Sequence, residues 1–193
     1  MIDLMLRRAA EAGVPLTAEQ AAKFETYHKM LVAANAQFNL TRVPDDITEA
    51  VDRNYLDCIA PLKNGFPIDV SRAIDVGSGA GFPGIPLSIC LPDVHFVLLD
   101  SLGKRVDFLK SVISALNLNA EAIHMRAEDA AKLPELRERF DIATARAVAS
   151  FIYSRTEMMV PGRKTSARRF MILAITSTAL SQACRPCGDT WRA

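Results

Sequence analysis

Apolar side chains recur at helical spacing through the first 65 residues of this 193-residue chain. Residues 2–11 predict a short first helix. Thr17 and Gln20 form a capping box that opens a longer second helix, and residues 44–46 open a third. The positions expected to face inward are Phe24, Tyr27, Leu31, Ala34 and Phe38 in the second helix, and Ile47, Ala50, Val51, Tyr55, Cys58, Ile59 and Leu62 in the third.

From residue 72 onward, short apolar runs alternate with amphipathic stretches, which predicts an α/β fold with a parallel sheet. We expect strands at 73–76, 95–99, 120–125 and 140–144, helices near 84–91 and 103–116, and a short helical stretch that contains Leu133 and Leu136. The predicted organisation is a helical preface (1–65), an α/β core (66–150) and an atypical basic C-terminal segment (151–193).

A glycine-rich loop follows the first predicted strand, with glycines at positions 77, 79, 81 and 84. Such a loop between a strand and a helix holds nucleotide-like cofactors in open α/β sheets. Asp75 precedes the first glycine, and Asp100 ends the next strand, at the spacing of a carboxylate that meets a ribose diol. Glu128 and Arg146 follow the third and fourth strands, so four polar side chains are expected at the carboxyl ends of the strands, where ligands bind.

NAD and S-adenosylmethionine both suit this geometry. The pyrophosphate of NAD requires backbone N–H groups at a helix N-terminus, and Pro83 and Pro86 remove two of them. S-adenosylmethionine carries an ammonium and a sulfonium, so Asp75 beside the loop attracts it. The residues alone favour the methyl donor and leave NAD open.

Three stretches carry a more specific resemblance: residues 38–41 (FNLT), 75–87 (DVGSGAGFPGIPL) and 99–105 (LDSLGKR). They resemble the bacterial 16S ribosomal RNA guanine-N7 methyltransferase family, also called glucose-inhibited division protein B, over about residues 1–150. The resemblance implies a class I, Rossmann-like methyltransferase fold and methyl transfer from S-adenosylmethionine to N7 of a guanine in 16S rRNA or the small ribosomal subunit. By the resemblance, Gly77 and Phe82 contact the methyl donor, Ala127 and Glu128 flank its adenine, and Arg146 lies beside the donor and the target base. The residues themselves add the loop glycines Gly79 and Gly81, together with Asp75 and Asp100, to the cofactor-binding set. Asn54 stands where many members of the family have histidine.

Guanine N7 has a lone pair and no proton to lose, so the reaction requires position and exclusion of water more than an acid–base pair. We expect Arg146 to hold the target base or a nearby phosphate; the alternative is an ordinary ion pair with Asp141 or Glu128. The candidates for contacts with RNA phosphates are Arg7, Arg8, Arg42, Arg53, Lys104, Arg105 and Lys110.

The C-terminal segment departs from this pattern. Residues 1–150 carry 16 basic and 20 acidic side chains, whereas residues 151–193 carry 7 and 2. The segment contains one apolar run, at 170–174, and this run does not match the later strands of the family, as if the chain were read in another frame or its end had diverged or been replaced. We therefore expect the sheet to lose an edge and the fold to lose stability.

Composition sets the remaining expectations. Half of the residues are hydrophobic, 23% are charged, and no apolar run approaches the roughly 20 residues of a membrane span. No signal peptide is recognisable, so we expect a cytoplasmic monomer without membrane contact. Cys184 and Cys187 have the spacing of half a zinc site, but no second pair lies near them, and we expect no metal.

Three functions follow from these observations. The first is an rRNA guanine-N7 methyltransferase, the second a non-catalytic RNA- or ribosome-binding remnant of the same family, and the third an NAD-binding oxidoreductase. Binding of the methyl donor or of NAD separates the first from the third. Methyl transfer separates the first from the second.

Overall fold

The computed structural model describes residues 1–64, 70–146 and 171–175. Their centre is a five-stranded sheet in the order β3-β2-β1-β4-β5, in which every neighbouring pair is parallel. The strands are β1 (Arg72–Val76), β2 (His95–Asp100), β3 (Ala120–His124), β4 (Ile142–Arg146) and β5 (Met171–Ile175). The expected parallel α/β fold is confirmed, and the chain order reverses between β1 and β4, where such sheets bind ligands.

The helical preface begins with α1 (Ile2–Glu11) and α2 (Ala18–Asn35). The capping box at the start of α2 is present in both directions: Oγ1 of Thr17 accepts from the Gln20 amide at 3.1 Å, and Oε1 of Gln20 accepts from the Thr17 amide at 2.9 Å. The first two helices are therefore confirmed, together with the signal that starts the second.

The expected third helix consists of four shorter pieces: α3 (Ile47–Ala50), the π-helix η1 (Val51–Leu56), α4 (Asp57–Ile59) and the 3-10 helix η2 (Ala60–Asn64). Its start is confirmed, because the carboxylate of Asp46 accepts from the Glu49 amide at 2.8 Å. Ile47 was expected to face inward, and that is wrong: its side chain is 37% exposed. The π-helix η1, which is called the π-turn below, could not be predicted from apolar spacing. Over so short a length, an α-helix and a π-helix place much the same apolar residues on one face.

Three helices accompany the sheet: α5 (Gly84–Cys90), α6 (Gly103–Leu116) and α7 (Ala127–Ala130). The helical stretch expected around Leu133 and Leu136 is wrong, because the chain forms turns after α7. Pro134 has no N–H to continue a helix there. The fourth strand also begins later than expected, at Ile142, while Phe140 packs before it against the guanidinium of Arg72.

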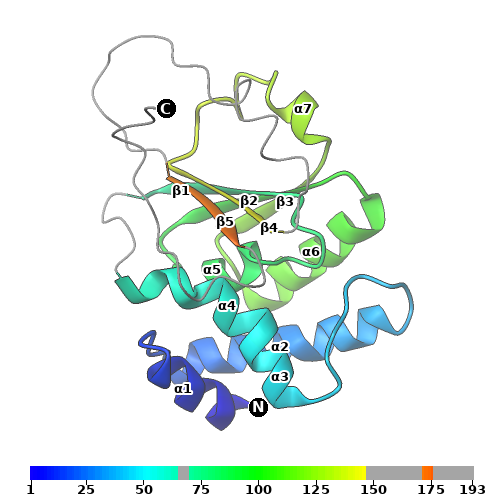
Figure 1. Ribbon diagram of the computed structural model, residues 1–193. Coiled ribbons are helices and arrows are strands. Elements are labelled where there is room, and N and C mark those ends of the chain that lie inside the picture. Colours follow the sequence, from blue (N-terminus) through cyan, green and yellow to red (C-terminus); the bar gives the residue numbers. More distant parts are fainter. Residues whose placement is uncertain (65–69, 147–170, 176–193) are drawn as a thin grey trace, which may run out of the picture.

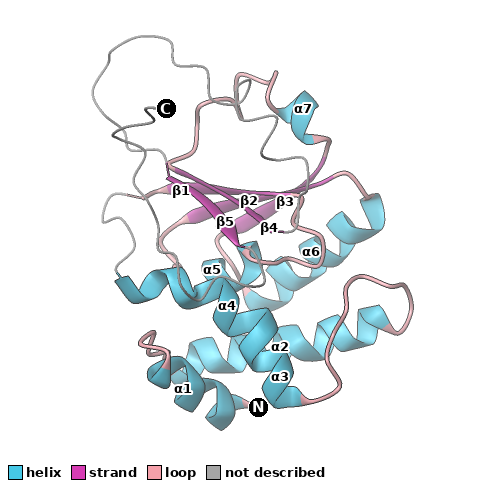
Figure 2. Ribbon diagram, in the orientation of Figure 1, coloured by secondary structure: helices cyan, strands magenta, loops and turns pink. Residues whose placement is uncertain are grey.

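The two faces of the sheet have different covers (Figure 1). Helices α1 to α6 lie on one side and α7 on the other, as the secondary-structure view also shows (Figure 2). Side chains alternate accordingly along β2: Phe96 and Leu98 belong to the larger buried cluster, Val97 and Leu99 to the smaller. The larger cluster runs without interruption from α1 to the sheet, so the preface and the α/β core share one hydrophobic interior.

The apolar run near the C-terminus has a place in the sheet. Residues 171–175 form β5, in register with β4 from Ile142 opposite Met171 to Arg146 opposite Ile175. From the sequence, no match to the later strands of the family was expected in this segment, and for residues 171–175 that expectation is wrong. The remaining expectations for 151–193, including those for Cys184 and Cys187, fall outside the described residues. In the described ranges, no helix has both the length and the apolar character needed to cross a membrane.

Candidate functional site

A cavity of about 650 Å³ opens at the carboxyl ends of β1, β2 and β4. This volume lies within the range of roughly 300–1,000 Å³ that is typical of small-molecule sites. One wall comes from the glycine loop and the end of β2, and the other from the helical preface and the end of β4. The described residues that line it are Leu40, Thr41, Arg42, Asn54, Gly77, Ser78, Gly79, Ala80, Phe82, Asp100, Ser101, Arg105 and Arg146.

The glycine loop is fixed to β2 by its own backbone. The amides of Gly77 and Ser78 donate to the carbonyl of Leu99 at 2.8 and 3.0 Å, and the amide of Gly79 donates to Oδ2 of Asp100 at 2.8 Å. Gly79 has a φ of +60°, and a Cβ there would meet no atom closer than 3.9 Å. This part of the loop therefore leaves room for a ligand to approach the backbone.

Gly81 has a different reason to be glycine. It does not line the cavity, and its φ is +106°. A Cβ there would lie 2.6 Å from Cγ1 of Ile85 and 2.9 Å from the hydroxyl of Tyr27. Gly81 therefore allows the loop to pack tightly on the helical layer.

Asp75 points into the protein and not into the cavity. Its side chain is fully buried, accepts from the Gly84 amide at 3.1 Å, and accepts from the hydroxyl of Thr144 at 2.9 Å. Burial raises the pKa of this carboxyl to about 6, against the lowering effect of its hydrogen bonds. The structure thus places Asp75 beneath the loop, where it joins the start of α5 to β4.

Asp100 lies at the wall of the cavity and is 3% exposed. One carboxylate oxygen accepts from the Leu102 amide at 2.9 Å, and the other accepts from Gly79. The guanidinium of Arg105 is 3.7 Å from the same Oδ2. The carboxylate is therefore held in place by backbone groups on both sides of the β2 end.

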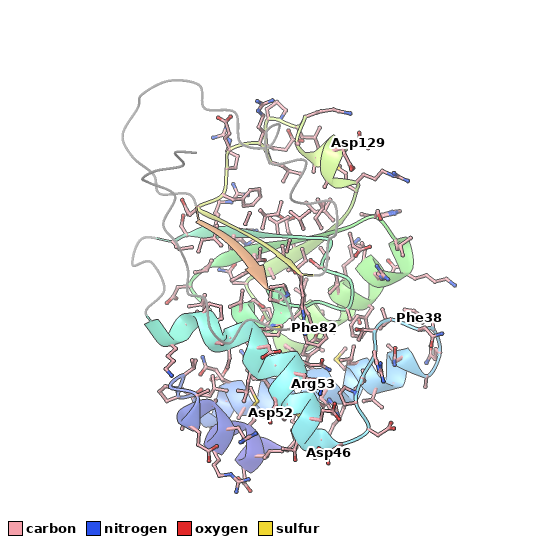
Figure 3. All side chains as sticks on the ribbon, viewed as in Figure 1. Phe38, Asp46, Asp52, Arg53, Phe82 and Asp129 are labelled. Atoms are coloured by element: carbon pink, nitrogen blue, oxygen red, sulfur yellow. The ribbon has the colours of Figure 1, made fainter. Side chains whose placement is uncertain are left out.

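Phe82 connects the loop to the helical preface through aromatic contacts. Its ring centroid lies 5.6 Å from that of Tyr27 and 5.8 Å from that of Tyr55. The hydroxyl of Tyr27 donates to the carbonyl of Ala80 at 2.7 Å, and burial raises the pKa of Tyr27 well above its ordinary value, so it stays a neutral donor. Figure 3 shows Phe82 between the sheet and the helical segment that carries Asp52 and Arg53.

Arg146 reaches from the end of β4 to the helical preface. Its Nη2 donates to the carbonyl of Arg53 at 2.9 Å, its Nη1 lies 3.4 Å from Sγ of Cys58, and its guanidinium carbon lies 5.6 Å from the centre of the Phe82 ring. Asp141, one of the acids considered as its partner, accepts instead from the amides of Ser71 and Arg72. Arg146 therefore lines the cavity while it ties β4 to η1.

The structure does not bring all the expected residues together. Gly77, Gly79, Phe82, Asp100 and Arg146 line the cavity, whereas Asp75 and Gly81 support it from behind. Ala127 and Glu128 belong to α7, on the other side of the sheet from α1 to α6, and are not among the residues that line the cavity. Glu128, the other acid considered for Arg146, is exposed there.

The wall from the preface was missed as a site by sequence reasoning. Leu40 and Thr41 line the cavity because Oδ1 of Asn35, at the end of α2, accepts from both of their amides, at 2.9 and 3.2 Å. The FNLT stretch was the available signal, but it indicated a family and no position. Asn54 also lines this wall, and its departure from the usual histidine was its only signal.

The basic residues considered for RNA differ in their partners. Arg8 pairs with Asp52 and Glu11, and Arg53 pairs with Glu49 at 3.0 Å. Within residues 1–64 and 70–146, no ion pair is found for Arg7, Arg42, Lys104 or Lys110. Of these four, Arg42 lines the cavity.

The family model for rRNA small subunit methyltransferase G matches residues 20–174. This chain belongs to that family. The match ends within β5, at residue 174, so the likeness extends beyond the 150 residues in which the motifs were recognised.

Relatives named ribosomal RNA small subunit methyltransferase G support the same assignment. Those of Clostridium beijerinckii and Clostridium perfringens are 47% and 45% identical over 149 residues, which is 77% of this chain and 62% of each relative. The chain thus spans less than two thirds of their length. Among solved structures, cofactor-bound Rv0187 from MTB superposes with a TM-score of 0.48 at 13% identity, over 76% of this chain and 64% of that one, which is too distant to bear on function.

Proposed function

We propose that this chain transfers a methyl group from S-adenosylmethionine to N7 of a guanine in 16S ribosomal RNA. The observation that carries the proposal is the junction of the glycine loop, Asp100 and Arg146 at one cavity, in a chain that belongs to the rRNA small subunit methyltransferase G family. Membership of that family also counts against the NAD-dependent oxidoreductase. We assign its action to the cytoplasm because 16S ribosomal RNA is the proposed substrate.

The cavity fits the methyl donor in size and in the groups that it presents. Space for close approach lies beside Gly79, and the carboxylate of Asp100 is held at the wall where a ribose diol would donate to it. We assign contacts with the donor to Gly77, Gly79 and Phe82, and the ribose to Asp100. Ala127 and Glu128 are assigned to the adenine from the family resemblance; they lie on α7 and are not among the residues that line the cavity.

Asp75 and Gly81 act through the loop in this proposal. Asp75 holds the Gly84 amide and the Thr144 hydroxyl, and Gly81 lets Tyr27 and Ile85 pack beneath the loop. Neither residue needs to touch the donor. Their contribution is to fix the backbone that does, which is the part of catalysis that depends on position.

The reaction needs no proton transfer at the nucleophile. When bound, S-adenosylmethionine supplies a methyl group on a positively charged sulfur. The N7 lone pair of guanine forms the new C–N bond as the S–C bond breaks, the sulfur leaves as a neutral thioether, and the positive charge passes to the guanine. The chain's task is to align N7 and exclude water, and Arg146, fixed between Arg53 and Phe82, forms the wall against which the base is held.

Two measurements on the purified chain test the proposal. In the first, calorimetric titration compares S-adenosylmethionine with NAD, and we expect binding of the methyl donor alone. In the second, the chain is incubated with radiolabelled donor and with 16S rRNA, either as a naked transcript or in small ribosomal subunits, and the methylated base is mapped. Label at N7 of a guanine is the expected result.

The other results correspond to the other functions. Binding of RNA and donor without transfer would identify a non-catalytic remnant. Binding of NAD without the methyl donor would overturn the proposal as a whole. Comparison of naked RNA with the subunit also identifies which of the two is the substrate.

A further inference from the structure

Asn54 is a buried polar residue whose side-chain nitrogen has no hydrogen-bond partner. It lies in η1, lines the cavity, and is 8% exposed. Its Nδ2 is the only buried side-chain nitrogen or oxygen without a hydrogen bond in the described part of the chain. A buried donor without a partner is costly, so such an atom at the wall of a cavity indicates a group that a ligand completes.

The backbone around Asn54 is held firmly, although its side chain is not paired. The thiol of Cys58 donates to the carbonyl of Asn54 at 3.0 Å, and Arg146 donates to the preceding carbonyl, that of Arg53. Tyr55 follows and packs on Phe82 with ring centroids 5.8 Å apart. The π-turn thus presents Asn54 at a fixed position, and π-turns occur frequently at functional sites.

The position of Asn54 favours the target base over the methyl donor as its ligand. The glycine loop and Asp100, to which the donor is assigned, form one wall of the cavity. Asn54 lies in the other wall with Arg146, Arg42 and Thr41, where cationic and neutral donors predominate. A base that enters between the two walls meets hydrogen-bond donors on the side of the preface.

We propose that Asn54 selects guanine by donating a hydrogen bond from Nδ2 to O6 of the target base. This inference rests on the proposed function. Guanine has an acceptor at O6 where adenine has an amino group, so a fixed donor discriminates between the two purines. O6 lies next to N7 on the same edge, and a hydrogen bond to O6 alone leaves the N7 lone pair free to accept the methyl group.

The decisive experiment pairs a change in the protein with a change in the base. The guanine that the wild-type chain methylates is first mapped in 16S rRNA, and an RNA with 2-aminopurine at that position is prepared by ligation. This base keeps N7 but lacks O6. Rates of methyl transfer are then measured for the wild type and for Asn54→Ala on both RNAs.

We expect the wild type to lose about 10- to 100-fold in rate when O6 is removed, the usual scale of one specific base contact. Asn54→Ala is expected to lose a similar factor on guanine and to show no further loss on 2-aminopurine. Asn54→Asp, which has the same shape but no N–H donor, should be at least as poor on guanine. The matched control is Asn119→Ala, because that amide is exposed and already bonded to His95 and Pro92; its rate should be unchanged.

Stability and donor affinity separate this role from a structural one. Nδ2 of Asn54 has no hydrogen bond to lose, so the Tm of Asn54→Ala should equal or exceed that of the wild type. Its Kd for S-adenosylmethionine should be unchanged. A lower Tm would make Asn54 a structural residue, and weaker donor binding would assign it to the donor; either result overturns the inference.

The proposed function and the inference fail in different ways. If the wild type transfers no methyl group to guanine N7, the proposed function fails and the inference falls with it. If the wild type is active and Asn54→Ala loses the same factor on both bases, or loses nothing, the function stands and the selection of O6 by Asn54 is wrong.

Discussion

The two walls of the cavity differ in how their polar groups are satisfied. In the glycine loop, the amides of Gly77, Ser78 and Gly79 all have partners, and the carboxylate of Asp100 is bonded on both oxygens. In the opposite wall, Nδ2 of Asn54 has no hydrogen bond and Arg42 has no ion pair in the described part of the chain. In the loop wall, these backbone amides and the Asp100 carboxylate are satisfied within the protein. In the wall from the preface, we expect a bound ligand to supply the missing partners.

An aromatic layer joins these walls and sets their spacing. Tyr27 bonds to Ala80 of the loop, and Tyr55 packs between Phe24 and Phe82. Arg146 crosses the same layer from β4 to η1. A change on one wall therefore reaches the other through packing, and variants that act on one wall alone are the sharpest tests of the difference.

The largest effect is expected from Gly81→Ala, which forces a side chain into the packed space beneath the glycine loop. The new Cβ would lie 2.6 Å from Ile85 and 3.1 Å from Leu109, at a φ of +106°. We expect the free energy of unfolding to fall by about 4 kcal/mol, because overpacking and backbone strain each cost about 1–3 kcal/mol. Urea denaturation measures the loss, and donor binding should disappear with it.

Gly79→Ala is the matched control for that substitution. Its φ of +60° is one that alanine adopts at a cost of about 1–2 kcal/mol, and its Cβ would meet open space. We expect a smaller loss of stability with a clear loss of donor affinity. Equal losses of stability in the two variants would contradict the different roles assigned to the two glycines.

The next effect is a pH dependence of the free energy of unfolding, which arises from the titration of Asp75. Burial raises its pKa from 3.8 to about 6, so between these values the folded chain binds more protons than the unfolded chain. Its contribution is fully present below about pH 4 and is lost as the pH rises through 6. At 1.36 kcal/mol per pKa unit, the loss approaches 3 kcal/mol at neutral pH.

Asp75→Asn tests this directly, since the amide can still accept from Gly84 and can donate to the Thr144 hydroxyl. We expect the variant to gain stability over the wild type between pH 4 and pH 7 and to run parallel to it above pH 7. Thermal unfolding at several pH values measures the difference. A constant difference across this range would show that Asp75 does not titrate there.

A smaller effect is expected from Tyr27→Phe, which removes one link between the aromatic layer and the loop. The buried carbonyl of Ala80 loses its hydrogen-bond donor, which should lower the free energy of unfolding by about 1–2 kcal/mol. The affinity for S-adenosylmethionine should fall severalfold because the loop is less well fixed. Calorimetry measures both the stability and the affinity. Thr26→Ala removes an exposed hydroxyl from the same helix, where it bonds to Ala22, and should change neither.

The sequence predicted the first four strands because each is a short, largely apolar run, although the helix expected between the third and the fourth was wrong. The fifth strand was missed because its partner, β4, lies 25 residues earlier, and the run itself says nothing about pairing. Alternation along β1 could have indicated that Asp75 faces the helices, because it shares a face with Ala73. Asp75 was associated with the cofactor by its short distance in sequence from Gly77, which does not indicate the face of the strand on which it lies.

The cavity wall that the helical preface contributes could not be predicted from the sequence pattern alone. Asn54 could be recognised as a ligand-binding candidate only from the structure, because the absence of a hydrogen-bond acceptor near Nδ2 is visible only in three dimensions. The π-turn that positions it has the same apolar spacing as an α-helix over so short a length. Residues in the loop, by contrast, are adjacent in sequence, and their motif could be read directly.

The smallest effect tests whether the unpaired charge of the second wall meets RNA. Arg42→Gln removes a cation at the cavity, and Arg7→Gln removes an exposed one on α1; neither has an ion pair in residues 1–64 and 70–146. If Arg42 contacts a phosphate, its loss should reduce the slope of log affinity against log salt by about 0.7–0.9, as expected for one fewer counterion released. Filter binding to 16S rRNA over a range of salt concentrations measures the slope, which should be unchanged in Arg7→Gln. Equal slopes for the two variants would place the RNA backbone elsewhere, and the cavity would then receive the base without the help of Arg42.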